Sequence, residues 1–314
     1  MNRKILVTGG TGLIGRKIVN ELCSEGAYVK LLTTNVKKAK SLFEKISTIE
    51  VLKWSLYYNP QSLKDVMEGT EAIINLAGAN VGDKRWNKEY KEVLYNSRID
   101  ITKLLVKTIR ICNDGPKIFI SASGVGVYGF CEDEIIDENS TTGDDFLAIL
   151  CRDWENAAMK AAEFNLRVVV IRTGLVLDKN DGALKQLLTP FKLFVGGKFG
   201  SGNQWFSWIH IDDIVRMYLF ALENNKLFGA VNGTSPNPVT NEEFAKTLGH
   251  VINRPSMIPL PAFALKIAVG EFATNLITGQ RVLPVKALKA GVEFRFPELK
   301  EALEDLLKKN LNVK

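Results

Sequence analysis

The sequence predicts an α/β protein with a doubly wound parallel sheet and a smaller C-terminal lobe. Up to about residue 176, short runs rich in Val, Ile and Leu alternate with stretches of helical periodicity. This alternation is typical of a parallel sheet that carries helices on both faces. Beyond that point the elements become shorter and are separated by Gly- and Pro-containing segments, which indicates a second lobe.

The predicted sheet begins with a strand at residues 4–8. A helix follows, on which Ile14, Ile18 and Leu22 recur at helical spacing until Gly26 ends it. A second strand at residues 28–33 completes a βαβ unit. Further strands are expected at residues 49–54, 72–77, 117–121 and 167–172. The helices between them are expected at residues 36–45, 60–68, 88–112 and 145–162.

The second lobe is predicted from shorter signals. Beyond a helix at residues 213–223 and a strand at 230–232, Thr240 and Glu243 form a capping box that starts another helix. Pro297 is expected as the first residue of an amphipathic terminal helix. We assign residues 1–176 and about 205–234 to the sheet domain, and residues 177–204 and 235–314 to the smaller lobe.

Composition is that of an ordinary globular protein. Of 314 residues, 46% are hydrophobic and 24% are charged, which is enough to build a large core. The net charge of +6 comes from basic residues scattered among acidic ones, so a solvated surface is favoured over nucleic-acid binding. The longest apolar stretch, residues 262–278, is interrupted by Lys266 and Glu271, so we expect an amphipathic helix packed on its own domain and no membrane association.

The cysteines and histidines exclude two other classes. Cys23, Cys112, Cys131 and Cys151 lie far apart and form no Cys-x-x-Cys pair, so free thiols in a reducing cytoplasm are expected. The first strand is predicted to begin near the start of the sequence, which adds to the expectation of a cytoplasmic protein. With only two histidines we predict no metal centre.

The most informative motif is the Gly-x-x-Gly-x-x-Gly turn between the first strand and the first helix. We expect Gly9 to permit the tight turn, Gly12 to let a pyrophosphate approach the backbone, and Gly15 to let helix and strand pack closely. The free N–H groups of the helix would face the phosphates. A purely structural turn is the alternative, but the complete βαβ context favours a Rossmann-type dinucleotide site. The predicted contacts are Gly9, Thr11, Gly12, Leu13, Ile14 and Gly15.

The end of the second strand indicates which coenzyme is bound. An acidic residue there would accept a hydrogen bond from the 2′-hydroxyl of NAD, but this chain has Thr33 and Thr34 followed by Lys37 and Lys38. Hydroxyl and ammonium groups suit a 2′-phosphate, so we expect NADP (NADPH) as the cofactor. The alternative is that both lysines are simply solvated at a helix start.

The ends of the next strands supply further candidates. Leu76, Ala77 and Gly78 would let the chain pass close to the riboses, although small residues can also serve strand–helix packing. The hydroxyls of Ser121 and Ser123 are expected to point into the same crevice.

Short motifs spread over almost the whole chain match one family. They occupy residues 9–15, 75–78, 97–98, 102, 121–123, 127–129, 154–155, 196–197, 200–202, 208–213 and 279–282. Together they resemble the extended or atypical branch of the short-chain dehydrogenase/reductase superfamily. The resemblance is strongest to an epimerase-like family whose bacterial members are labelled sugar-nucleotide epimerases or cell-division inhibitors.

This resemblance implies an NADP-binding oxidoreductase or epimerase. It places Thr33 and Thr34 at the adenosine phosphate and Leu76 and Ala77 at the riboses. It also places Arg98 near the adenosine half and Val176 near the nicotinamide. Family members commonly carry Arg where this chain has Thr34, so the contact to a 2′-phosphate differs here.

The chain departs from the superfamily in its catalytic pair. Counting back from Trp154, the positions of the usual Tyr and of the Lys four residues later hold Leu147 and Cys151. Leucine has no proton to give, and cysteine cannot replace a fixed ammonium group. The remaining catalytic candidates are Ser123, which resembles the substrate-polarising Ser, and Tyr128, which we expect to line the pocket.

The chain beyond residue 176 offers weaker candidates. His210 and Asp212 form a relay-like pair, although a histidine at a helix start more often packs. Trp205, Phe206 and Trp208 are equally consistent with a pocket wall and with a core between lobes. Gln280 and Arg281 would recognise an anion or form a structural salt bridge.

Two classes of function follow from these observations. The first is hydride transfer between NADP and an unidentified small-molecule substrate. The second is a non-catalytic NADPH-binding sensor or partner-binding protein. We expect no nucleic-acid partner and leave a homodimer open.

Overall fold

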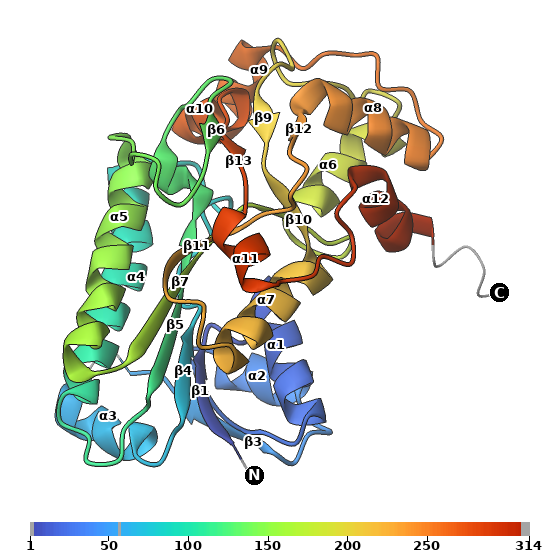
Figure 1. Cartoon of the computed structure of the whole chain (residues 1–314). Helices are drawn as coiled ribbons and strands as arrows, with labels where there is room; N and C mark the ends of the chain where they lie inside the picture. Colours follow the sequence, from blue (N-terminus) through green and yellow to red (C-terminus); the bar gives the residue numbers. More distant parts are fainter. Residues whose placement is uncertain (1–2, 56–57, 309–314) are drawn as a thin grey trace.

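The central element of the computed structural model is a seven-stranded parallel sheet in the order β11-β7-β5-β4-β1-β2-β3 (Figure 1). The structure describes residues 3–55 and 58–308. The strands are β1 (Lys4–Thr8), β2 (Tyr28–Thr33), β3 (Ile49–Lys53), β4 (Ala72–Asn75), β5 (Ile118–Gly124), β7 (Arg167–Thr173) and β11 (Gly229–Gly233). The strand order reverses between β1 and β4, so the predicted doubly wound sheet is confirmed.

Helices cover both faces of this sheet (Figure 1). One face is covered by α1 (Leu13–Ser24), α2 (Val36–Leu42) and α7 (Ile211–Glu223), whose apolar side chains share a core with Val7 and Leu31. The other face is covered by α3 (Pro60–Met67), α4 (Lys88–Ile109) and α5 (Phe146–Met159), which pack on Leu6 and Ile73. Successive strand residues therefore enter opposite cores, which explains why the strands are apolar throughout.

Shorter elements lie above the carboxyl ends of the strands (Figure 1). The helices are α6 (Gly182–Lys192), α8 (Asn241–Val251), α9 (Ala262–Val269), α10 (Ala273–Ile277), α11 (Val285–Ala290) and α12 (Leu299–Lys308). Three strand pairs join distant segments: β8 (Leu175–Leu177) with β10 (Trp208–His210), β9 (Trp205–Phe206) with β12 (Val239–Thr240), and β6 (Ile135–Ile136) with β13 (Arg281–Val282).

Two predicted helix starts can be compared with the structure. Thr240 caps α8 as expected, because its hydroxyl accepts a hydrogen bond from the Glu243 amide at 3.2 Å. The terminal helix begins at Leu299, two residues later than the predicted start at Pro297. Within the described ranges, no helix combines the length and the apolar character needed to cross a membrane.

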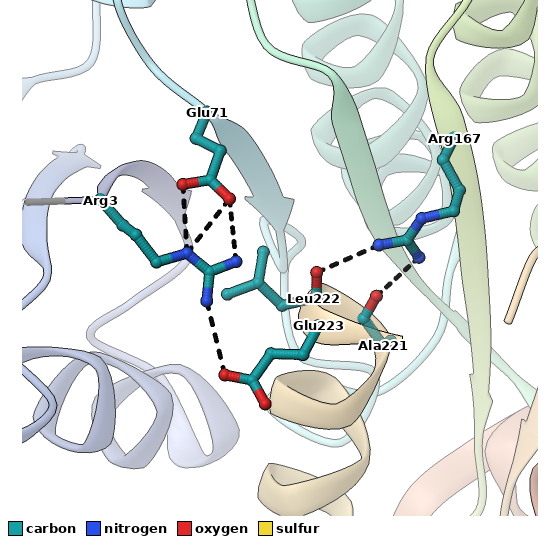
Figure 2. A network of polar contacts seen from close by, with 6 residues as sticks. All are labelled: Arg3, Glu71, Arg167, Ala221, Leu222 and Glu223. Carbon is teal, nitrogen blue, oxygen red and sulfur yellow. Dashed lines mark hydrogen bonds and ion pairs between the residues drawn. The ribbon is translucent and has the colours of Figure 1, made fainter. Parts of the chain in front are cut away.

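Two arginines join elements at the amino edge of the sheet, where its parallel strands begin (Figure 2). Arg3 pairs with Glu71, at 2.9 Å between Nη2 and Oε1, and also reaches Glu223 at the end of α7. Arg167, at the start of β7, donates to the α7 carbonyls of Ala221 and Leu222 at 2.7 and 3.1 Å. The Arg167 hydrogen bonds satisfy two carbonyls at the C-terminal end of α7, and Arg3 joins two carboxylates, so this edge is structural. The opposite edge carries the candidate site.

Candidate functional site

The three glycines of the turn after β1 meet three different requirements. Gly9 has a φ of +69°, and a Cβ there would lie 2.5 Å from the Leu76 carbonyl oxygen. A Cβ at Gly15 would lie 2.4 Å from the Gly9 oxygen, so this glycine permits close packing. Gly12 has ordinary extended backbone, and its Cβ would meet only the Gly9 oxygen, at 3.3 Å. The fold itself therefore explains Gly9 and Gly15, whereas Gly12 leaves open space for a ligand.

The amino end of α1 is prepared for an anion. No side chain of the described residues caps this helix, and its first turn holds no acidic residue. The amides of Leu13 and Ile14 belong to that turn, and Thr11 precedes it, half-buried. The two basic side chains that follow are already paired, Arg16 with Asp181 and Lys17 with Asp212. An anion here would therefore be held mainly by backbone N–H groups and the helix dipole.

The end of β2 presents polar groups to solvent. Thr33 is buried, and its hydroxyl accepts a hydrogen bond from the Asn35 amide at 3.1 Å. Thr34, Lys37 and Lys38 are exposed, and no salt bridge found in the described part of the chain engages either lysine. The residues at this strand end are Thr33 and Thr34, and two exposed ammonium groups follow them.

Arg98 lies across the turn that follows β4. Its Nη2 donates to the Ala79 carbonyl at 2.8 Å, and its guanidinium stacks on Trp154, with Cζ 5.2 Å from the ring centroid. A Cβ at Gly78 would lie 2.9 Å from Arg98 Cζ, so this glycine makes room for the arginine side chain, and its predicted approach to the riboses stays a prediction. Burial lowers the pKa of Arg98.

Ser121 lies below the crevice and does not open into it. It is fully buried and accepts a hydrogen bond from Asn75, at 3.4 Å. Asn75 also contacts Thr8 and Thr102, at 2.7 and 2.8 Å. These buried hydroxyl and amide groups satisfy one another between β1, β4, β5 and α4. The expectation that the Ser121 hydroxyl points into the crevice is therefore corrected.

A cavity of about 310 Å³ lies beyond the ends of β5 and β7. Its walls include Ser123, Leu147 and Cys151, so the two positions that replace the usual Tyr and Lys do face it. The other lining residues include Arg98, Trp154, Trp205, Phe206 and Gln280, which the sequence analysis singled out, and Gly174, Leu175, Asn275 and Thr278, which it did not. Trp208 is fully buried in the main core instead. Val176 and its neighbour Leu175 both pack against that core, and Leu175 also lines the cavity.

Ser123 is joined to a buried ion pair. Its Oγ donates to Glu155 Oε1 at 2.7 Å, and Glu155 accepts two further hydrogen bonds from Arg172, at 2.9 and 2.8 Å. Arg172 is mostly buried, as is Glu155. Sequence reasoning used Glu155 only as part of a family motif, and it missed Arg172. Their pairing depends on bringing α5 beside β7, which no local pattern reveals.

Tyr128 occupies the far end of the same network. Its hydroxyl accepts a hydrogen bond from Arg172 at 2.8 Å and donates one to Asn232 at 2.7 Å. Burial raises the pKa of Tyr128 to about 12. The side chain belongs to a small apolar cluster with Val127 and Ile136 and does not line the cavity. The expected place of Tyr128 in the pocket wall is therefore corrected.

Cys151 is also an unreactive group. Burial raises the pKa of its thiol to about 11, so it stays protonated near neutral pH. All four cysteines are free in the structure, as predicted. Gln280 lines the cavity and donates to the Gly129 carbonyl, while Arg281 stacks on Trp205 at 4.3 Å.

His210 has a structural place. It is buried, accepts a hydrogen bond from the Asp212 amide at 3.0 Å, and so caps α7. Its ring packs on Phe296, with 4.0 Å between centroids. Burial lowers the pKa of His210, and Asp212 is engaged by Lys17 at 2.7 Å. One potential metal-ligand atom from each of His210, Asp212 and Asp305 lies within 4.8 Å of the other two. The charge of Asp212 is already neutralised by Lys17, which weakens this cluster as a metal site.

Comparison with known proteins identifies the family. Residues 5–232 match the model of the NAD dependent epimerase/dehydratase family. The chain belongs to this family. Residues 260–306 also match a domain of unknown function, DUF1731.

Relatives of this epimerase-family chain match it over nearly its full length. It is 41% identical over 310 residues to the Arabidopsis thaliana epimerase family protein SDR39U1 homolog, chloroplastic, covering 96% of this chain and 86% of that protein. Human epimerase family protein SDR39U1 (isoform 2), solved with NADPH, is 34% identical, with a TM-score of 0.85 and coverage of 98% and 99%. UDP-glucuronic acid 4-epimerase of Bacillus cereus is 17% identical with a TM-score of 0.76, over 96% of this chain and 97% of that one, so it shares the fold.

Proposed function

We propose that this epimerase-family protein binds NADPH across the carboxyl edge of its sheet. The observation that carries the proposal is Gly12, where a side chain would meet no obstacle but the Gly9 oxygen, directly at the uncapped amino end of α1. A diphosphate placed there would accept hydrogen bonds from the amides of Leu13 and Ile14. The human neighbour solved with NADPH supports this choice, as do the exposed Lys37 and Lys38 after the end of β2.

We further propose that the cavity at Ser123 receives a small hydroxyl or carbonyl compound. The bound nicotinamide would supply the hydride donor or acceptor. Because Ser123 already donates to Glu155, its oxygen is left to accept the proton of a substrate hydroxyl while its own proton moves to the carboxylate. Glu155 is also held by Arg172, and protonation would weaken those bonds, so we expect slow turnover.

A second candidate function is an NADPH-binding sensor without turnover. The observation that favours it is the pair Leu147 and Cys151, which face the cavity where a proton-relaying Tyr and a fixed cation are usual. The occupied site would then serve to engage a partner, with a second copy of the chain as one choice. Four free thiols fit a reducing compartment such as the cytoplasm.

The two functions are separated by turnover. Purified protein is incubated with NADPH or NADP and a panel of small carbonyl and hydroxyl compounds, and the nicotinamide absorbance is followed. Hydride transfer that is lost in Ser123→Ala but kept in Ser47→Ala, a change at an exposed turn residue, supports the enzyme. NADPH binding with no turnover on any compound contradicts it and favours the sensor. The Ser123→Ala variant must retain NADPH binding for the loss to be assigned to chemistry.

A further inference from the structure

Arg98 is a cation that lines the cavity. Arg3 and Arg172 each have a carboxylate partner within 3 Å, whereas no salt bridge among the described residues involves Arg98. Its two hydrogen-bonded neighbours are the carbonyls of Leu94 and Ala79, at 3.0 and 2.8 Å. Neutral carbonyls do not cancel its charge. A partly buried guanidinium of this kind remains open to a further acceptor.

The side chain is held in one position. Its guanidinium donates to two carbonyls and stacks on the ring of Trp154. It also packs against the backbone at Gly78, where an added Cβ would lie 2.9 Å from Arg98 Cζ and 3.1 Å from Arg98 Nε. Two of the five N–H donors of a guanidinium are used by the carbonyls, which leaves three. Arg98 lines the cavity together with Ser123 and Cys151, so these donors are near the place where a ligand would lie.

The position of Arg98 relative to Cys151 is the decisive observation. The family resemblance implies that Cys151 stands where superfamily members carry a lysine that holds the nicotinamide ribose. Both side chains line one cavity, and the charge of Arg98 acts on the Cys151 thiol. Arg98 is carried by α4 and Cys151 by α5, two helices that pack side by side. A cation from another helix therefore lines the same cavity as Cys151.

We propose that Arg98 takes over the ribose-holding role of the missing lysine and binds the hydroxyls of the nicotinamide ribose. This inference rests on the proposed function, and it moves Arg98 from the adenosine half, where the family resemblance placed it, to the nicotinamide half. A guanidinium offers paired donors to neighbouring hydroxyl oxygens, and its stacking on Trp154 fixes their direction. Its positive charge also disfavours the cationic oxidised nicotinamide, so NADPH should bind more tightly than NADP⁺.

The test compares whole coenzyme with its adenosine half. Calorimetry on the full chain measures binding of NADPH, NADP⁺ and 2′,5′-ADP to wild type, Arg98→Met, Arg98→Lys and Arg110→Met. Arg110 is exposed at the end of the same helix and serves as the matched control. Thermal unfolding of each variant checks folding, and Arg98→Lys keeps the charge should Arg98→Met fold poorly.

We expect Arg98→Met to weaken NADPH binding by about tenfold or more, the loss typical of a charge-assisted hydrogen bond. Binding of 2′,5′-ADP should change by less than about twofold. Arg98→Lys should restore part of the affinity, and the preference for NADPH over NADP⁺ should shrink in Arg98→Met. Equal losses for NADPH and 2′,5′-ADP would place Arg98 at the adenosine half and overturn the proposal, as would unchanged NADPH binding. Wild-type protein that binds no NADPH would instead overturn the proposed function itself.

Discussion

The substitution Gly12→Ala separates coenzyme binding from folding. Gly12 has φ −81° and ψ 179°, which any residue adopts, and its added Cβ would touch only the Gly9 oxygen, at 3.3 Å. Gly15→Ala is the matched control in the same turn. Its Cβ would lie 2.4 Å from the Gly9 oxygen and 2.7 Å from the Gly10 Cα, both backbone atoms that cannot move aside cheaply.

The expected changes in stability differ between the two variants. For Gly12→Ala, the lower entropy of the unfolded chain stabilises by about 0.4–1 kcal/mol. Alanine is a poorer N-cap than glycine by roughly 0.5 kcal/mol, so the free energy of unfolding should stay within about 1 kcal/mol of wild type. For Gly15→Ala, overpacking against backbone should lower the free energy of unfolding by about 1–3 kcal/mol.

NADPH affinity should fall more in Gly12→Ala than in Gly15→Ala, the reverse of the order expected for stability. In Gly12→Ala a methyl group stands where the diphosphate approaches the α1 amides, so NADPH affinity should fall at least about tenfold, or about 1.4 kcal/mol. Urea unfolding followed by circular dichroism gives the stability, and calorimetry gives the affinity. Wild-type affinity in Gly12→Ala would refute the reasoning, because the turn would then not contact the coenzyme. A loss of stability as large as in Gly15→Ala would show instead that Gly12 is structural.

Three further predictions concern other parts of the molecule. Arg167→Ala removes hydrogen bonds to the carbonyls at the end of α7 and should lower the free energy of unfolding by about 2 kcal/mol. NADPH affinity should stay unchanged, and weaker NADPH binding would contradict a structural role for this end of the sheet. Burial lowers the pKa of His210 despite nearby carboxylates, so the unfolded chain binds more protons and stability should fall as pH drops below about 6.5. Denaturation at several pH values should show a smaller decrease in His210→Asn, which keeps a capping side chain, and an equal decrease would assign the effect to other groups. The double variant Lys37→Glu and Lys38→Glu should show an about tenfold lower preference for NADPH over NADH, measured by competition between the two coenzymes. An unchanged preference would show that both lysines are only solvated.

Most of the central sheet could be predicted because its signals are local. The apolar runs of β1, β2 and β4 and the periodicity of α1 each lie within one short segment of sequence. Parallel order and helical cover then follow from general rules of α/β folds. The predicted helix ends differ from the observed ones by a few residues, because caps depend on individual hydrogen bonds. For example, α4 ends at Ile109, whereas the sequence predicted an end at residue 112.

The candidate site was less predictable because its contacts join distant segments. The hydrogen bond between Tyr128 and Asn232 spans 104 residues, and that between Ser123 and Glu155 spans 32. The strand pair β6 and β13 joins Ile135 to Arg281 with two residues on each side, too few for any period to show. From the sequence, Tyr128 was expected in the pocket wall. In the structure its hydroxyl accepts a hydrogen bond from the buried Arg172 of β7, and Tyr128 does not line the cavity.

A crystal structure of the full chain grown with NADPH tests the central claim most directly. The measured quantity is the distance from the diphosphate oxygens to the backbone nitrogens at the start of α1. We predict contacts of about 3 Å to the amides of Leu13 and Ile14. A diphosphate bound elsewhere, or a side chain filling the space above Gly12, would contradict the account.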